Sequence, residues 1–450
     1  MNLSNKTVNT IVNHPFFRGS AIAFLGAFAV NILSYLFNVV IGRMLGVVGY
    51  GEYLALISIL YLSSVPSNVL ATIVTKYVAL YSAKNESEKI KPLLIIMTKY
   101  SLIFSALFLA ILMIFRGQIL SNLKLNDVAS LILISLIFAT TFPQTLLNGA
   151  FTGLQKFASA NIFAAILVIT RIILSILLIL AGLHVNGVLI GMILSSVLVI
   201  VLSWISIDKA VMQAELTISR FIAKSRMFIT YLFNPYVDKT NSITLNREML
   251  TFTLFSTFNS WGLGSLVQTD IILAKSFLSP YEAGLYSSLA ITCKVIPFFV
   301  QPLIIVMFPQ IVQRVAQKKN FLPLFSVVLA VVTAGAGFVT IIYILFPTVV
   351  ISLLFGSKFL AAAPYVGLFS ISQLAYALVN LFSYFFLSIG RNKTAGLVMV
   401  AAILQGIGIM LFHESIWQIV TVSIIVLGGC VVLYGILTLQ FYFSMRKKEL

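Results

Sequence analysis

Twelve long apolar runs occupy almost the whole of this 450-residue chain. Most of them hold about 20 apolar residues, the length of helix that crosses a bilayer core roughly 30 Å thick. Backbone polar groups in hydrocarbon are satisfied only within helices or closed barrels, and these runs lack the alternating pattern of barrel strands. We therefore expect an all-α integral membrane protein with about 12 transmembrane helices. The expected segments are 19–41, 53–75, 100–115, 128–149, 158–181, 187–207, 251–273, 283–308, 324–346, 361–387, 394–412 and 417–441.

The charged residues follow these runs. The chain is 60% hydrophobic and only 9% charged, which excludes an ordinary soluble domain. Its net charge of +17 would indicate a nucleic-acid partner only if the basic residues gathered on one face. Instead, 22 of the 29 Lys and Arg residues fall in alternate gaps, which the positive-inside rule assigns to the cytoplasm. We therefore expect both termini in the cytoplasm and no nucleic-acid partner.

The sequence offers little for catalysis or metal binding. Cys293 and Cys430 both lie inside apolar runs, so neither a disulfide framework nor a metal-binding spacing is present. None of the three histidines lies near a second ligand in the sequence. The predicted external gaps are too short to hold a catalytic loop. We therefore expect no metal, no bound cofactor and no enzymatic activity.

The longest gap divides the runs into two sets of six. We predict an N-terminal six-helix lobe at 1–207, a cytoplasmic linker at 208–248 and a C-terminal six-helix lobe at 249–450. Between residues 216 and 233, apolar side chains alternate in helical fashion with basic ones. This segment is either a basic amphipathic helix on the cytoplasmic leaflet or a solvated connector.

The two halves resemble each other in sequence. Residues 38–43 and 51–53 align with 270–275 and 284–286 at offsets of 232 and 233, and 153–156 align with 388–391 at 235. Pro66 in the second expected helix and Pro297 in the eighth give both helices a tendency to bend. Because each half has six spans, the second half enters the membrane in the same orientation. The sequence thus predicts a parallel internal repeat, an arrangement that many transporters share.

Several motifs resemble one known family. The stretch IGRMLG at 41–46, followed by GYGEY at 49–53, resembles the signature of the polysaccharide-unit flippases. QTDIILA at 268–274, with GLY at 284–286, and NGAFTGLQK at 148–156 are similar to further patterns of that family. The same superfamily also holds multidrug and toxic-compound exporters and lipid II flippases.

This resemblance implies a flippase of the cytoplasmic membrane of a bacterium or archaeon. Its cargo would be polyprenyl-(di)phosphate-linked oligosaccharide units for a surface polysaccharide such as O-antigen, moved by alternating access. Expected partners are the lipid bilayer, the lipid-linked oligosaccharide, a polysaccharide polymerase and glycosyltransferases. The alternatives are a cation-coupled multidrug exporter of the same superfamily, a lipid II flippase and a non-transporting scaffold of a glycan-assembly complex.

Ionisable side chains within membrane helices are costly and usually functional, so they are the first site candidates. Arg171 lies midway along the fifth run and Lys294 deep in the eighth. The resemblance implies that they bind the phosphate or diphosphate head, for which Arg supplies a fork of donors and Lys a point charge. Internal pairing is the alternative. Lys76, at the end of the second run, either joins this set or extends to the interface.

The remaining candidates each have a structural alternative as well. Asp270 is either a ligand for a coupling ion, Na⁺ or H⁺, or the counter-ion of a neighbouring Lys or Arg. Arg43 and Lys275 occupy equivalent places in the two halves, where they either form the outer rim of a cavity or anchor helices at the interface. Polar residues within the runs either contact glycan hydroxyls or hold helices together. These residues are Asn31, Asn38, Gln268, Gln301 and Asn380.

Overall fold

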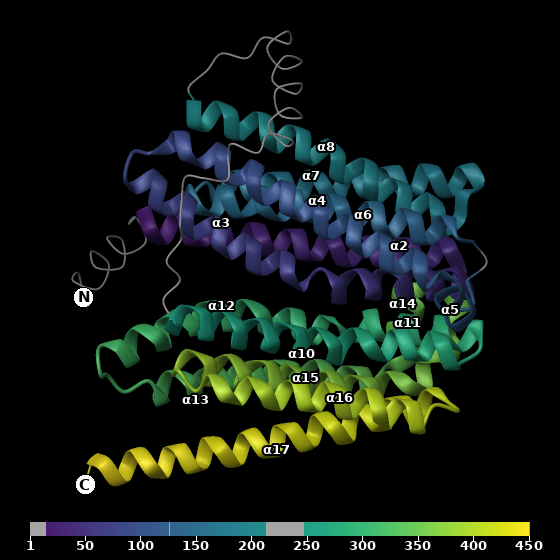
Figure 1. Cartoon of the computed structure of the whole chain (residues 1–450). Helices are drawn as coiled ribbons and strands as arrows, with labels where there is room; N and C mark the ends of the chain where they lie inside the picture. The colour runs from purple at the N-terminus through teal and green to yellow at the C-terminus, as the bar shows by residue number, and fades with distance from the viewer. Residues whose placement is uncertain (1–14, 126, 213–246, 450) are drawn as a thin grey trace, which may run out of the picture. The chain divides into compact units, whose positions relative to one another are not determined.

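The computed structural model describes residues 15–125, 127–212 and 247–449, and it contains helices but no strand among them (Figure 1). This confirms the all-α prediction. The chain divides into two compact units. Unit 1 comprises Met1–Ile41, Pro66–Gly117 and Asp127–Thr244. Unit 2 comprises Gly42–Val65, Gln118–Asn126 and Leu245–Leu450. Of each unit, the structure describes only the residues that fall within 15–125, 127–212 and 247–449.

Unit 1 contains the first part of the long helix α2 and the helices that follow it up to the middle of the chain. They are α2 (Pro15–Ser63, as far as Ile41), α3 (Val65–Ala83), the 3-10 turn η1 (Ser87–Lys89), α4 (Ile90–Ile114), α6 (Ala129–Gly153), α7 (Phe157–Leu178), the π-helical turn η2 (Ile179–Leu183) and α8 (His184–Met212).

Unit 2 contains the helices of the second half together with two segments from the first. The early segments are the second part of α2 and most of α5 (Arg116–Asn122). The others are α10 (Arg247–Phe277), α11 (Pro280–Cys293), α12 (Val295–Ala316), α13 (Leu322–Leu345), α14 (Pro347–Phe355), η4 (Ser357–Ala362), α15 (Ala363–Ser388), η5 (Asn392–Thr394), α16 (Ala395–Leu411) and α17 (Ile416–Glu449).

Nine helical stretches among the described residues are long and apolar enough to cross a membrane. One of these stretches, Phe157–Ile207, contains both α7 and α8, so two expected segments fall within it. The expected segment 53–75 lies partly within the candidate span Gly26–Ser63 and partly on α3, and the expected segment 251–273 on α10 lies outside the nine. Polar side chains interrupt α10, among them Asn259, Gln268 and Asp270, and such residues lower the hydropathy of a helix that remains helical throughout.

The expected linker at 208–248 lies largely outside the described residues, and the amphipathic helix expected at 216–233 lies wholly outside them. The proposed lobe boundaries therefore remain a prediction.

The internal repeat is visible in the backbone. Three pairs of residues with positive φ recur in the two halves, with differences in residue number of 233, 235 and 232. These differences are close to the offsets of 232 to 235 found in the sequence alignment. The pairs are Asn85 and Lys318, Gln155 and Gly390, and Lys124 and Gly356. Because positive φ values are uncommon outside Gly, this recurrence reflects the same turns made twice.

The second helix of each half is broken, as the prolines predicted. α2 ends at Ser63 and α3 begins at Val65, just before Pro66, while α11 ends at Cys293 and α12 begins at Val295, just before Pro297. Proline lacks the N–H that would bond the carbonyl four residues earlier. For Pro66 that carbonyl belongs to Leu62, and the indole Nε1 of Trp261 on α10 donates to it at 3.0 Å. The break therefore leaves no unpaired backbone acceptor at Leu62.

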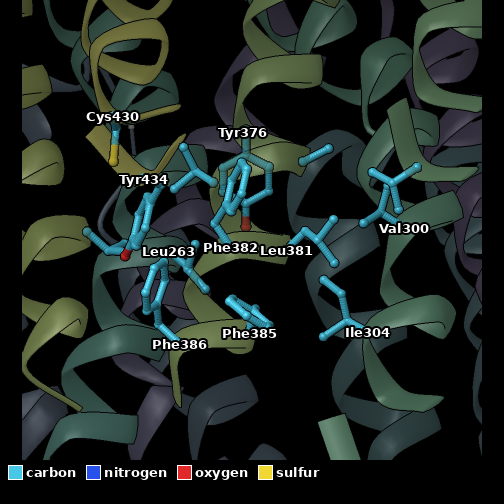
Figure 2. Packing of buried hydrophobic residues seen from close by; sticks show 14 of the residues in the cluster. Leu263, Val300, Ile304, Tyr376, Leu381, Phe382, Phe385, Phe386, Cys430 and Tyr434 are labelled. Atoms are coloured by element: carbon cyan, nitrogen blue, oxygen red, sulfur yellow. The ribbon is translucent and has the colours of Figure 1, made fainter. Parts of the chain in front are cut away.

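Stacked aromatic residues join aliphatic ones in the core of unit 2 (Figure 2). Phe382 on α15 stacks on Tyr434 of α17 with ring planes 4° apart, and Phe385 stacks on Phe325 of α13 with ring centroids 3.8 Å apart. Phe386, on the same helix, also stacks on Tyr434. α15 thus supplies aromatic side chains to both neighbours and forms the centre of the unit.

In unit 1, small residues allow α7 and α8 to approach closely. A Cβ on Gly191 would lie 2.6 Å from Ser175 Oγ and 2.8 Å from Ser175 N, and one on Gly187 would lie 3.0 Å from the Leu178 carbonyl carbon. Between helices in lipid, such close backbone contact replaces the hydrophobic driving force that is absent there. The spacing of Gly187 and Gly191 predicts this packing from the sequence.

We expect Gly191→Ala to lower the thermal unfolding temperature in detergent, because the added methyl group would overlap the α7 backbone. Gly428→Ala is the matched control, since a Cβ at Gly428 on α17 meets nothing within 4 Å. Equal unfolding temperatures for the two variants would show that the α7–α8 contact does not limit stability.

Candidate functional site

A buried charged cluster lies in unit 2, where α10 meets α11 and the break after α11. Asp270 on α10 is 3% exposed, and Lys294 at the break is 9% exposed. Asp270 Oδ2 accepts a hydrogen bond of 2.7 Å from the hydroxyl of Tyr286 on α11, and Oδ1 accepts one of 2.8 Å from the backbone N–H of Ile271. The carboxylate thus has donors on both oxygens.

Lys294 lies close enough to Asp270 for an electrostatic attraction between them. No N–O contact within 4.0 Å joins Lys294 to Asp270, unlike the close pair that Lys89 and Glu86 form elsewhere. Lys294 therefore compensates Asp270 at longer range, while Tyr286 is the side chain that contacts the carboxylate directly. A cation that is not committed to a close ion pair retains its donors for an anionic ligand.

Arg171 lies on α7 in unit 1 and is half-buried. Its guanidinium carbon lies 5.8 Å from the ring centroid of Phe37 on α2, so the cation lies over an aromatic face. This contact holds the planar group against a buried side chain, since Phe37 is only 2% exposed. A planar guanidinium also has the geometry to bind a phosphate through two donors.

The other candidate cations lie within α3, within α2 and in the last turn of α10. Lys76 on α3 is exposed, with Nζ 5.9 Å from the ring centroid of Tyr77. Arg43 is exposed and donates to backbone carbonyls of Leu353 and Leu354 at the end of α14. Lys275, in the last turn of α10, is only 2% exposed. The guanidinium of Arg43 is therefore committed to the protein backbone in this structure.

The candidate glycan contacts differ in their surroundings. Asn38 donates to the Ser34 carbonyl of its own helix at 2.8 Å, and Gln268 Oε1 accepts from Ser58 Oγ at 3.0 Å, joining α10 to the second part of α2. Asn31 is exposed and Gln301 is half-buried. The described residues supply no hydrogen-bond partner for either amide atom of Asn380, which is completely buried on α15.

Tyr286 is the site residue that the sequence did not assign. It stands in the repeat motif at 284–286, but the spacing of 16 residues from Asp270 gives no local signal of contact. The internal repeat could have pointed to Tyr286, because Tyr53 occupies the equivalent position in the first half. Both tyrosines are buried in the structure. Buried tyrosines need a hydrogen-bond partner, and a nearby acidic residue supplies one.

The comparisons with known proteins agree with this architecture. A family model described as polysaccharide biosynthesis protein matches residues 16–315, two thirds of the chain. This chain belongs to that family. The search of curated proteins finds no significant match.

Solved structures show the fold. An inward-facing multidrug resistance MATE family transporter of the MOP superfamily matches with a TM-score of 0.72 at 14% identity, covering 92% of this chain and 95% of the other. An outward-facing structure of such a transporter matches with a TM-score of 0.64 at 12% identity, covering 95% and 96%. The eukaryotic MATE transporter AtDTX14 matches with 0.59 at 15%, covering 94% of each chain.

The near-complete coverage confirms the predicted fold of about 12 membrane helices in two six-helix lobes. Family membership and fold together describe a multi-pass helical membrane protein of the polysaccharide biosynthesis family.

We expect Tyr286→Phe to destabilise the protein by about 1–3 kcal/mol, because it removes a donor from a buried carboxylate. The measurement is thermal or denaturant unfolding in detergent. Tyr442→Phe is the matched control, since Tyr442 is 45% exposed on α17. Equal stability of the two variants would show that Asp270 does not depend on the Tyr286 hydroxyl.

Proposed function

We propose that this protein is a flippase for polyprenyl-(di)phosphate-linked oligosaccharides, operating by alternating access in the cytoplasmic membrane. The observation that carries the proposal is the sign of the charge inside the apolar helices. Arg171 and Lys294 are both cations within candidate membrane spans, whereas Asp270 is accompanied by Tyr286 and by the attraction of Lys294. The balance favours an anionic cargo over a cationic drug.

The chemistry of such a cargo explains why a protein is needed. Each sugar hydroxyl left without a partner in hydrocarbon costs a few kcal/mol, and the charged head costs more. A membrane potential that is negative inside favours outward movement of the head by about 2.3 kcal/mol per charge per 100 mV. We propose that Arg171 and Lys294 bind the phosphate or diphosphate, with Lys76 as an additional cation near the predicted cytoplasmic end.

Membership of a polysaccharide biosynthesis family supports a glycan as the polar part of the cargo. Asn31, Asn38, Gln268, Gln301 and Asn380 are the proposed contacts for its hydroxyls. Among these, the half-buried amides Gln268 and Gln301 combine partial access with donors and acceptors. A polymerase and glycosyltransferases are the proposed partners, because the glycan must be assembled before transport and joined after it.

The test is reconstitution in proteoliposomes containing a fluorescent polyprenyl-diphosphate oligosaccharide. A membrane-impermeant quencher then reports the fraction of lipid that changes leaflet. We expect exchange with the native protein and its loss with Arg171→Ala or Lys294→Ala, because each removes a cation that binds the head. Lys358→Ala is the control, since Lys358 is an exposed lysine on η4, at the very start of the candidate span Ser357–Ser388.

Two results would overturn the proposal. Undiminished exchange in both Arg171→Ala and Lys294→Ala would show that these residues do not bind the head group. No exchange with several glycans, together with gradient-driven efflux of a cationic dye, would identify a multidrug exporter instead.

Asp270→Asn separates the two roles considered for this carboxylate. If Asp270 is a counter-ion held by Tyr286, the variant should lose stability while glycan exchange keeps its dependence on Na⁺ and H⁺ gradients. The measurements are unfolding in detergent and exchange with and without each gradient. Loss of a gradient dependence in a fully stable variant would instead identify Asp270 as the ligand of a coupling ion.

A further inference from the structure

Within unit 2, the two halves of the chain meet at a pair of glycines. A Cβ on Gly51 of α2 would lie 2.9 Å from Gly284 Cα, and a Cβ on Gly284 of α11 would lie 1.9 Å from the carbonyl oxygen of Val47. Neither position has space for any other residue without movement of the backbone. Gly51 and Gly284 are also equivalent positions of the internal repeat, so two copies of one element contact each other through the same residue.

Arg43 makes a second connection between the halves. Its Nε donates to the Leu354 carbonyl at 2.7 Å, and its Nη2 donates to the Leu353 carbonyl. These carbonyls lie in the last turn of α14, where the helix leaves its acceptors without intrahelical partners. A cation at a helix C-terminus also interacts favourably with the helix dipole. Arg43 therefore caps a helix that belongs to the other half of the sequence.

Lys275, the repeat equivalent of Arg43, also lies near residues of the other half. Lys275 is attracted by Glu52 of the second part of α2 and repelled by Lys124, which follows α5. Lys124 Nζ in turn donates to the Leu278 carbonyl at 2.6 Å, just beyond α10. Thus Arg43 donates to carbonyls at the end of α14, and Lys124 donates to a carbonyl just beyond α10, so each half bonds to the backbone of the other.

An aromatic group completes these contacts. The ring centroid of Tyr50 lies 5.4 Å from that of Phe355 and 6.3 Å from that of Phe359, and all three side chains are buried. A Cβ on Gly42 would lie 2.6 Å from Phe355 Cε1, so this glycine also faces the group. The contact is apolar at its centre and has charge-assisted hydrogen bonds at its edge.

All these residues lie at one end of the helices. Arg43, Lys124 and Lys275 fall in gaps that the positive-inside rule assigns to the outside. A transporter that works by alternating access must separate its halves at this end to release cargo outward. We propose that the Gly51–Gly284 contact, the Arg43 cap on α14 and the Tyr50 aromatic group form an external latch that holds this end closed between transport cycles.

The two sides of the latch are unequal in strength. Arg43 makes two charge-assisted hydrogen bonds to carbonyls of α14. Lys275 has an attraction to Glu52 offset by repulsion from Lys124. Because Arg43 bonds directly to the other half, we expect its release to be the main step in opening and Lys275 to contribute less.

This inference rests on alternating access, which is part of the proposed function, but not on the identity of the cargo. The test uses the reporter Ala283→Cys in a background of Cys293→Ala and Cys430→Ala. Ala283 is 2% exposed, and its carbonyl carbon lies 3.2 Å from the position of a Cβ on Gly51. A membrane-impermeant maleimide applied from outside labels this thiol only when the latch parts.

We expect Arg43→Ala to raise the labelling rate about tenfold, as loss of charge-assisted hydrogen bonds predicts. Lys358→Ala removes an equal charge from η4 and should leave the rate unchanged, and Lys275→Ala should give a smaller increase than Arg43→Ala. A rate for Arg43→Ala equal to that of Lys358→Ala would overturn the latch.

A second pair of variants decides the question if Arg43→Ala does not accumulate in membranes. Gly51→Ala adds a methyl group to the glycine contact and should speed labelling. Gly264→Ala should not, since the nearest atom to a Cβ there, Val65 Cγ2, is 3.9 Å away. Equal labelling of these two variants would also overturn the latch. Because no glycan is present, a working latch with no oligosaccharide exchange would leave this inference standing and refute only the proposed cargo.

Discussion

A membrane helix can be broken only where something replaces the backbone hydrogen bond that is lost, because hydrocarbon contains no water to do so. This constraint explains why the second helix of each half is accompanied by an aromatic donor from another helix. The indole of Trp261 donates to the Leu62 carbonyl, whose helical donor is missing at Pro66, and the hydroxyl of Tyr343 donates to the Thr292 carbonyl beside the break at Lys294. The breaks are thereby fixed in position. One of them places Lys294 between α11 and α12, where a cation would otherwise interrupt a continuous apolar helix.

The two halves share their backbone turns but differ in their chemistry. Asp270 is equivalent to Asn38 in the repeat, and Tyr286 to Tyr53. Asn38 bonds to its own helix, whereas Asp270 is bonded by Tyr286 and attracted by Lys294. The second half therefore carries a buried charged cluster that the first half lacks at these positions. A symmetric scaffold with charge in one half allows the two halves to respond differently to an ion or a membrane potential.

The sequence predicted the helical fold, the repeat, the broken helices and the close packing at Gly187 and Gly191, because hydrophobic length, proline and glycine act locally. It did not predict the contacts between distant segments. Tyr286 is separated from Asp270 by a loop and a turn of α11, and Arg43 caps carbonyls more than 300 residues away. Likewise, apolar length alone did not reveal that the segment after Gly42 belongs with the helices of the second half. Such pairings depend on helix packing, which one sequence does not specify.

The contact between Gly51 and Gly284 also bears on the origin of the chain. Equivalent residues of a duplicated unit touch only on the axis that relates the two copies. Before duplication, the same contact would have been isologous, made by one glycine of a six-helix ancestor with itself across a homodimer. In a homodimer, a substitution at this glycine would change both sides of the contact. In the fused chain, it changes only one side. Fusion therefore relaxed the constraint on every residue along this axis and allowed each half to change alone.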